Sequence, residues 1–210
     1  MKKLAIFGVG GAGREVAEWA RVCGFQGITL TVDDNYFTNS IINGFPSIPF
    51  SQMVIEEYEW LVAVADPSLR AVIVKKIENR AEFATLVHPN STVQSSSQIG
   101  EGVLVGPGVV IANHVKIGKH VFVNSQSYIG HDGDIGDYVT ISPRATVLGN
   151  CKIESHVFLG ANSSIKEGTT ISSGTFVGMG AVVIKNLSEG VYVGNPAREI
   201  SSPPLAKDMG

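Results

Sequence analysis

Aliphatic residues recur at every sixth position through the C-terminal two-thirds of the chain. The series runs from residue 87 to residue 183 without a gap, and all seventeen members except Leu159 are Val or Ile. An amphipathic helix repeats its apolar residues every three or four positions and a strand every two, so neither element explains the pattern. The members are Val87, Val93, Ile99, Val105, Ile111, Ile117, Val123, Ile129, Ile135, Ile141, Val147, Ile153, Leu159, Ile165, Ile171, Val177 and Val183.

A period of six residues is typical of a parallel β-helix, in which each hexapeptide forms one short strand and one corner. Three hexapeptides make one triangular coil, and successive coils stack about 4.8 Å apart. The aliphatic residue points into the column, and a small residue or Val four positions later fits near the corner. Seventeen hexapeptides predict nearly six coils without a long insertion. A β-sandwich would need a period of two instead.

The first 80 or so residues lack this period and alternate predicted strands and helices. We expect strands at KKLAIFG, ITLTVDDN and EWLVAVA, and helices at REVAEWARVCG and DPSLRAVIVKKIENRA. Asp66 is placed to cap the second helix, and Pro67 occupies its first position. The sequence therefore predicts an α/β, Rossmann-like βαβ domain over residues 1–82 and an all-β parallel β-helix over 83–200. We assign no role to the tail at 201–210.

A glycine motif joins the first predicted strand to the first predicted helix. Gly8, Gly10 and Gly13 satisfy G-x-G-x-x-G, and Asp33 follows Gly13 by twenty residues. Backbone amides at a helix N-terminus favour a phosphate or pyrophosphate group. Since this region supplies only half of a dinucleotide fold, a mononucleotide or sugar nucleotide fits better than NAD. An NAD-binding regulatory module, and glycines that serve only strand–helix packing, remain the alternatives.

Composition and charge exclude several classes of protein. The 210-residue chain has a net charge of −3 with acids and bases scattered, which argues against a nucleic-acid or anionic-membrane surface. Its apolar runs are too short to span a bilayer, and MKKLAIFGVGG breaks into glycines without a cleavage site. We therefore expect a cytoplasmic protein. We interpret Cys23 and Cys151 as packing residues rather than as a disulfide or metal pair.

One histidine differs from the others of the repeat. His114, His120 and His156 each lie three positions after an aliphatic member and directly before a valine, which indicates a structural corner residue. His131 lies two positions after Ile129, outside the apolar column, and is followed by an aspartate. The difference favours a special role for His131, although a solvated corner residue is the alternative.

With both halves in view, the chain resembles the bacterial NeuD/PglD-type family of sialic acid O-acetyltransferases and nucleotide-4-aminosugar N-acetyltransferases. The resemblance covers nearly the whole chain and rests on IFGVGGAG, the pair Asp33-Asp34, LVHPNSTV, IGHDGDIGDYVTISP, VGMGAVVIKNL and VGNPAR. It implies a homotrimer of left-handed β-helices, with acetyl-CoA in the groove between neighbouring subunits and no metal.

The resemblance also implies roles for individual residues. His131 would be the general base, and Asp132 would orient it and raise its basicity. Gly149, one coil further along, would direct a backbone N–H at the thioester oxygen. The other cofactor-binding positions would be Thr140, where some members carry a second histidine, and Ala161, Met179 and Gly180. The acceptor-binding positions would be Gly10, Gly11, Ala12 (often His in the family), Gly13, Asp33, Asp34 and Ala65.

The implied chemistry is direct acyl transfer from a thioester to a sugar amine, without an acyl-enzyme. Neutral imidazole suits proton removal from the amine, and backbone N–H groups stabilise the tetrahedral oxyanion. We rank a nucleotide-linked 4-amino-4,6-dideoxy sugar first as acceptor, and O-acetylation of sialic acid or a related sugar second. A γ-type carbonic anhydrase would need three converging zinc histidines, and a non-enzymatic β-helix would show rows of outward threonines. The sequence offers neither pattern.

Overall fold

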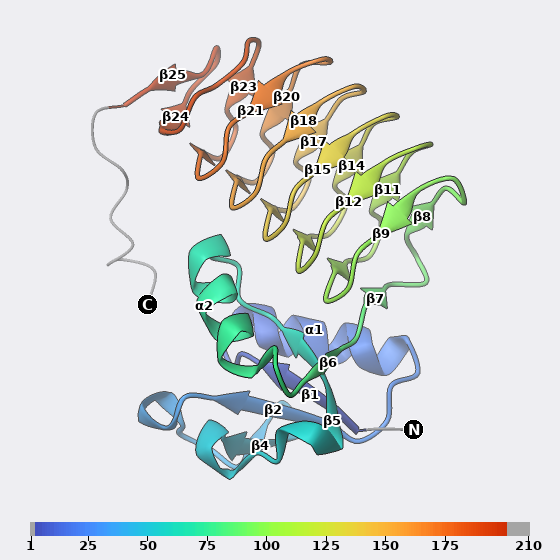
Figure 1. Ribbon diagram of the computed structural model, residues 1–210, viewed down its shortest axis with the longest axis vertical. Coiled ribbons are helices and arrows are strands. Elements are labelled where there is room, and N and C mark those ends of the chain that lie inside the picture. The colour runs from blue at the N-terminus through green and yellow to red at the C-terminus, as the bar shows by residue number, and fades with distance from the viewer. Residues whose placement is uncertain (1–2, 201–210) are drawn as a thin grey trace.

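The computed structural model describes residues 3–200, so the tail predicted at 201–210 lies outside the described residues. It consists of an α/β domain followed by a column of stacked coils (Figure 1). This arrangement confirms the predicted fold class. β6, at Glu82–Phe83, pairs within the first sheet and therefore spans the expected junction between residues 82 and 83.

The N-terminal domain is built on a six-stranded sheet with the order β3-β4-β2-β1-β5-β6. Neighbouring strands are parallel, except that β3 and β4 form an antiparallel pair. The elements are β1 (Lys3–Phe7), α1 (Gly11–Val22), β2 (Ile28–Val32), η1 (Asp34–Tyr36), β3 (Ile41–Ile42), β4 (Phe45–Pro49), η2 (Phe50–Gln52), η3 (Ile55–Glu57), β5 (Tyr58–Val62), α2 (Pro67–Ile77) and β6 (Glu82–Phe83).

The three strands and two helices predicted here are confirmed, and β3, β4 and β6 are additions. Side chains of β1 alternate between two clusters, because successive strand residues point to opposite faces. Leu4 and Ile6 pack with α1, whereas Ala5 and Phe7 pack with α2. The predicted cap is present, since the Asp66 carboxylate accepts a hydrogen bond of 2.7 Å from the Leu69 N–H.

The β-helix has three parallel sheets, one on each face of the column, and residues eighteen apart pair in register. The junction face contains β7 (Leu86–Val87), β10 (Leu104–Val105), β13 (Phe122–Val123), β16 (Thr140–Ile141), β19 (Phe158–Leu159), β22 (Phe176–Val177), β24 (Val191–Val193) and the antiparallel β25 (Arg198–Glu199). The apolar face contains β8 (Thr92–Val93), β11 (Val110–Ile111), β14 (Tyr128–Ile129), β17 (Thr146–Val147), β20 (Ser164–Ile165) and β23 (Val182–Val183). The charged face contains β9 (Gln98–Ile99), β12 (Lys116–Ile117), β15 (Asp134–Ile135), β18 (Lys152–Ile153) and β21 (Thr170–Ile171).

The hexad series forms the core of this column, as predicted. Its members from Val105 to Val183 are buried, and Val93 and Ile99 pack against them while partly exposed. Val87 is 39% exposed because it lies in β7, at the open end of the junction face. His114, His120 and His156 have positive φ angles of 59°, 53° and 61°, which confirms them as corner residues.

The N-terminal domain packs against the junction face of its own column. The Trp19 ring of α1 meets Phe122 edge-on with centroids 6.1 Å apart, and Leu86 and Leu104 join the same apolar cluster. On the other side of the sheet, Arg70 of α2 reaches the carbonyl oxygens of the coils. The two domains therefore share a continuous buried junction.

Candidate active site

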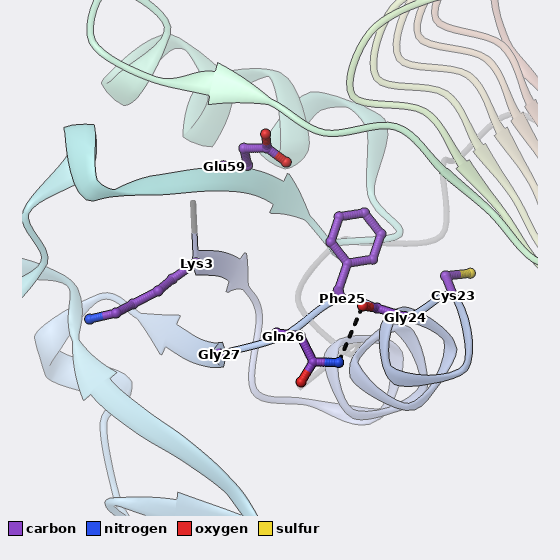
Figure 2. Close-up of a pocket in the computed structure, with 7 residues that line it drawn as sticks. All are labelled: Lys3, Cys23, Gly24, Phe25, Gln26, Gly27 and Glu59. Atoms are coloured by element: carbon purple, nitrogen blue, oxygen red, sulfur yellow. Dashed lines mark hydrogen bonds between the residues drawn. The ribbon is translucent and has the colours of Figure 1, made fainter. Parts of the chain in front are cut away.

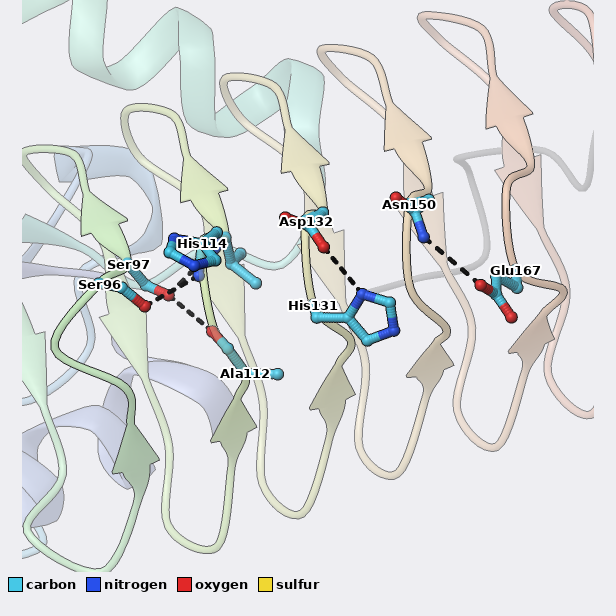
Figure 3. A network of polar contacts seen from close by, with 9 residues as sticks. Ser96, Ser97, Ala112, His114, His131, Asp132, Asn150 and Glu167 are labelled. Carbon is cyan, nitrogen blue, oxygen red and sulfur yellow. Dashed lines mark hydrogen bonds and ion pairs between the residues drawn. The ribbon is translucent and has the colours of Figure 1, made fainter.

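His131 lies on the corner between β14 of the apolar face and β15 of the charged face. Its side chain is 52% exposed and points away from the apolar column (Figure 3). In a triangular column this corner, here called the His131 corner, is opposite the junction face. The imidazole is therefore on the side of the column away from the N-terminal domain of the same chain.

Asp132 contacts the imidazole directly. Its Oδ2 is 2.9 Å from Nδ1 of His131, as Figure 3 shows. Asp132 has a φ angle of 57°, a conformation that aspartate tolerates better than most residues with a side chain. A carboxylate can only accept at this distance, so in the neutral imidazole Nδ1 carries the hydrogen and Nε2 keeps its lone pair. The pair thus presents an outward-facing imidazole with a free basic nitrogen.

Gly149 lies under the imidazole, one coil further along the same corner. A Cβ built on Gly149 would be 2.6 Å from both Cε1 and Nε2 of His131, so only glycine leaves room for the ring here. Within residues 3–200 the Gly149 N–H donates no hydrogen bond. A free backbone donor therefore lies beside a free imidazole nitrogen, which are the two groups that acyl transfer requires.

The His131 corner carries further polar side chains that the sequence reading did not single out. Asn150 follows Gly149, and its Nδ2 is 3.4 Å from Oε1 of Glu167 in the next coil (Figure 3). Asn150 and Glu167 lie eighteen residues beyond Asp132 and Gly149 respectively. Stepping by three hexapeptides from the His-Asp pair would have found both.

Three of the expected cofactor residues lie on a different corner. Ala161, Met179 and Gly180 occupy turns between the junction face and the apolar face, here called the Met179 corner. Met179 is 81% exposed, and Gly180 has a φ angle of 67°. Within one chain the whole apolar face separates these residues from His131, so a single chain does not bring the expected cofactor residues together.

Thr140 needs a correction. It is only 2% exposed, and its hydroxyl donates a hydrogen bond of 2.6 Å to the Ala65 carbonyl and accepts one of 3.0 Å from Arg70 Nη1. Thr140 belongs to β16 of the junction face, not to either exposed corner. Because the hydroxyl is buried and already paired, it is not available to hold a cofactor.

The expected acceptor residues gather at one edge of the N-terminal sheet. The segments Gly10–Gly13, Asp33–Asp34 and Ala65 follow the carboxyl ends of β1, β2 and β5, and β1 lies between the other two strands. Nucleotides bind at this kind of edge in open α/β sheets, where the strand order reverses. The structure therefore brings all seven expected acceptor positions to a single edge.

Within this edge the residues differ in their surroundings. A Cβ on Gly10 or Gly11 would meet nothing within 4 Å, whereas one on Gly13 would lie 2.0 Å from the Gly8 carbonyl oxygen. Gly13 thus serves strand–helix packing, and Gly10 and Gly11 leave open space at the start of α1. Ala12 is half-buried against the α1 cluster.

The two aspartates already have partners. Asp33 pairs with Lys76 at 2.9 Å, and Asp34 accepts hydrogen bonds from the Ser51 hydroxyl and, at 3.0 Å, from the Ser51 N–H. The Ser51 hydroxyl and N–H hold the pKa of the exposed Asp34 carboxyl below its usual value. The Asp34 carboxyl is therefore ionised at neutral pH, and both aspartate side chains are held in place by their partners.

One hollow of the surface lies away from both of these regions. A cavity of about 450 Å³ is lined by Lys3, Glu59 and the segment from Cys23 to Gly27 (Figure 2). These residues lie at the amino end of β1 and β5 and after the end of α1, so this hollow is at the opposite edge of the sheet from the glycine motif. Cys23 and Cys151 are free thiols, and burial raises the pKa of each.

Within residues 3–200, no cluster of three or more His, Cys, Asp or Glu side chains is placed to hold a metal ion. No helix in that range combines the length and apolarity needed to cross a membrane.

Comparison with known families matches both halves of the chain. A family model described as the PglD N-terminal domain matches residues 3–77, and the hexapeptide repeat of succinyl-transferase matches residues 151–185. Among curated proteins, UDP-N-acetylbacillosamine N-acetyltransferase from Bacillus subtilis (strain 168) is 31% identical over 110 residues. The aligned region covers 50% of this chain and 51% of that protein, about half the length of each.

Solved structures resemble the chain over nearly its whole length. The acetyltransferase domain of PglB from Neisseria gonorrhoeae FA1090 is 31% identical with a TM-score of 0.88, covering 95% of this chain and 100% of that chain. WeeI from Acinetobacter baumannii AYE is 30% identical with a TM-score of 0.88 and the same coverage, 95% and 100%. PerB from Caulobacter crescentus, solved with CoA and GDP-perosamine, is 26% identical with a TM-score of 0.87, covering 96% and 98%.

The likenesses to the PglB domain and to WeeI span both domains of the chain, since each covers 95% of it at 30% identity or more. The chain therefore belongs to the NeuD/PglD-type family of sugar acetyltransferases.

Proposed function

We propose that this protein transfers the acetyl group of acetyl-CoA to the amino group of a nucleotide-linked 4-amino-4,6-dideoxy sugar. The observation that carries the proposal is the His131 corner, where a free imidazole nitrogen lies over a glycine with an unpaired N–H. Relatives support the substrates: PerB is solved with CoA and GDP-perosamine, and PglB with acetyl coenzyme A. The curated relative is named for N-acetylation of a UDP-linked sugar.

The geometry suits a direct transfer. The sugar amine attacks the thioester carbonyl carbon and forms the C–N bond, while Nε2 of His131 takes the proton that the nitrogen gives up. Asp132, at 2.9 Å from Nδ1, stabilises the imidazolium that forms. The Gly149 N–H stabilises the tetrahedral oxyanion. The C–S bond then breaks, and the proton on His131 passes to the departing CoA thiolate, which restores the neutral imidazole.

A second copy of the chain is needed to complete this site. The N-terminal domain with its acceptor edge covers the junction face, and the His131 corner is on the opposite side of the same column. The expected cofactor residues Ala161, Met179 and Gly180 lie across the apolar face from His131. An acceptor and a pantetheine arm held by those elements would therefore reach the His131 corner of a neighbouring copy.

The faces of the column favour a trimer as that assembly. The apolar face presents Val110, Leu148 and Ile184 to solvent, at 36%, 42% and 50% exposure. The charged face instead presents Lys116, Asp134 and Lys152. Burying the apolar face by a three-fold rotation would pair one copy's His131 corner with the next copy's Met179 corner. We infer a homotrimer with three equivalent sites.

The test is His131→Ala, assayed by release of CoA thiol with UDP-, dTDP- and GDP-linked 4-aminosugars. We expect a fall in kcat of at least about 100-fold, the lower range for loss of a general base, with assembly and acetyl-CoA binding unchanged. His114→Asn is the matched control, because His114 lies on the same corner one coil away and Asn tolerates its positive φ. A near-normal rate for His131→Ala would remove this residue from the mechanism.

A further inference from the structure

Arg70 is the most deeply buried charged residue of the described chain. It lies in the first turn of α2, is 1% exposed, and has no ion-pair partner among residues 3–200. Burial lowers the pKa of its guanidinium to about 9, so it still carries its charge at neutral pH. The Asp66 carboxylate favours the charged form but makes no direct ion pair with Arg70. A buried charge of this kind persists only where hydrogen bonds to the charged group replace the lost water.

The guanidinium finds those bonds in carbonyl groups from both domains. On the N-terminal side, Nη1 donates to the carbonyls of Val64 at 2.6 Å and Ala65 at 3.2 Å. On the β-helix side, Nε donates to the His120 carbonyl at 2.8 Å, and Nη2 donates to those of Tyr138 at 2.7 Å and Val139 at 3.1 Å. One planar group thus holds the loop after β5 against two successive coils.

Thr140 closes the same network. Its hydroxyl accepts a hydrogen bond from Arg70 Nη1 at 3.0 Å and donates one to the Ala65 carbonyl at 2.6 Å. The Ala65 carbonyl is therefore held by both side chains. Ala65 itself is exposed and belongs to the carboxyl edge of the sheet, beside the glycine motif. The network ends at the edge where the acceptor is expected.

The rest of the junction could hold the domains together without this network. Trp19, Phe122, Leu86 and Leu104 already form an apolar contact between α1 and the junction face. That apolar contact already attaches the domains, so attachment alone does not require a charge whose burial costs free energy. An apolar contact is also non-directional, whereas hydrogen bonds from a planar guanidinium to carbonyl oxygens fix both distance and orientation.

We propose that Arg70, with Thr140, is a positioning residue that sets the acceptor edge of the N-terminal domain at a fixed distance and angle from the β-helix. This rests on the proposed function. The column positions the coenzyme groove and the domain positions the acceptor, so their relative placement decides whether amine and thioester meet. A misplacement of about 1 Å at a reacting centre can lower the rate by about 100-fold.

Thr140→Val and Arg70→Met test the inference in the full-length protein with acetyl-CoA and the aminosugar nucleotide that the wild type uses. For Thr140→Val, which keeps the shape and removes the hydroxyl, we expect about a tenfold fall in kcat/KM for the acceptor. The KM for acetyl-CoA should change by less than threefold. Arg70→Met should lower kcat/KM for the acceptor by at least a hundredfold. The matched control is Arg80→Met, since Arg80 follows α2 but pairs with Glu56 at the surface.

The double variant distinguishes positioning from general weakening. If Arg70 and Thr140 act as one unit, Arg70→Met with Thr140→Val should lose no more acceptor kcat/KM than Arg70→Met alone. Equal losses for acceptor and acetyl-CoA, or a Thr140→Val variant with unchanged kinetics, would overturn the inference. If Arg70→Met does not fold, Thr140→Val decides the question by itself.

A readout without turnover keeps the inference separate from the proposed function. Hydrogen exchange of the amides of residues 63–66 should become at least about tenfold faster in Thr140→Val, while the amides of β13 and β19 should keep their wild-type rates. If the wild type acetylates none of the aminosugars tested, the proposed function fails and this exchange experiment still decides the role of Arg70. Unchanged exchange at residues 63–66 would refute it.

Discussion

The contact between Gly149 and His131 predicts the effect of adding one methyl group to the site. In Gly149→Ala the new Cβ would lie 2.6 Å from Cε1 and Nε2 of His131 and 3.0 Å from Nδ1. Carbon atoms in ordinary contact are about 3.5–4.0 Å apart, so the ring must move by about 1 Å. Gly149 is not among the residues with positive φ, so alanine brings no backbone strain.

The displaced atom is the one that takes the proton. A shift of about 1 Å at a catalytic group can lower turnover by about 100-fold, or about 2.7 kcal/mol in the activation free energy. The ring is half-exposed and can turn toward solvent, so the free energy of unfolding should change by less than about 1 kcal/mol. We therefore expect kcat to fall strongly in a protein of nearly unchanged stability.

Steady-state thiol release gives kcat, thermal unfolding gives the stability, and titration calorimetry gives the affinity for CoA. The matched control compares the single variant His131→Ala with the double variant that carries both His131→Ala and Gly149→Ala. If the methyl group acts through the imidazole, the double variant should be no slower than the single one. A Gly149→Ala enzyme within threefold of the wild-type kcat would refute the proposed position of the base.

Two further predictions concern assembly and pH. Leu148→Asp and Ile184→Asp each place a charge on the apolar face, so we expect the proposed trimer not to form and activity to be lost. Analytical ultracentrifugation measures the assembly, and Lys152→Asp on the charged face is the control. Trimers in the first two variants would contradict the proposed assembly. Burial lowers the pKa of His120 to about 4, so the unfolded state binds a proton more tightly. Stability should therefore fall as the pH falls from about 6.5 to about 4, by up to about 3 kcal/mol from this residue. In urea unfolding, His120→Asn should remove most of that loss, and an unchanged pH profile would contradict it.

The hexad period predicted the column well, because burial of one residue in six is a local property that repeats. Every member from Val105 onward is buried, and the departures are the first three members, Val87, Val93 and Ile99, at the open end of the column. The corner position of His114, His120 and His156 could also be predicted, since their shared register in the hexapeptide indicates a repeated backbone conformation. The same reasoning found the strand, glycine turn and capped helix of the N-terminal domain.

The short strands β3, β4 and β6 could not be predicted from the sequence pattern. β3 and β6 are two residues long, and β4 contains two prolines, so their pattern is too brief or too irregular to be recognised. They pair because β2 and β5 leave open edges on the sheet. Their existence follows from what lies beside them rather than from their own residues.

The sequence alone determined which residues line the column, which histidine stands apart and where the glycine motif lies. Only the tertiary structure decided that Gly149 lies in contact with the His131 ring and that Thr140 is buried with Arg70 at the junction, away from Ala161, Met179 and Gly180 on another corner. A repeat encodes the inward or outward direction of each side chain, because that depends on position within one hexapeptide. Contacts between coils and between domains depend on packing across the chain, which no local pattern contains.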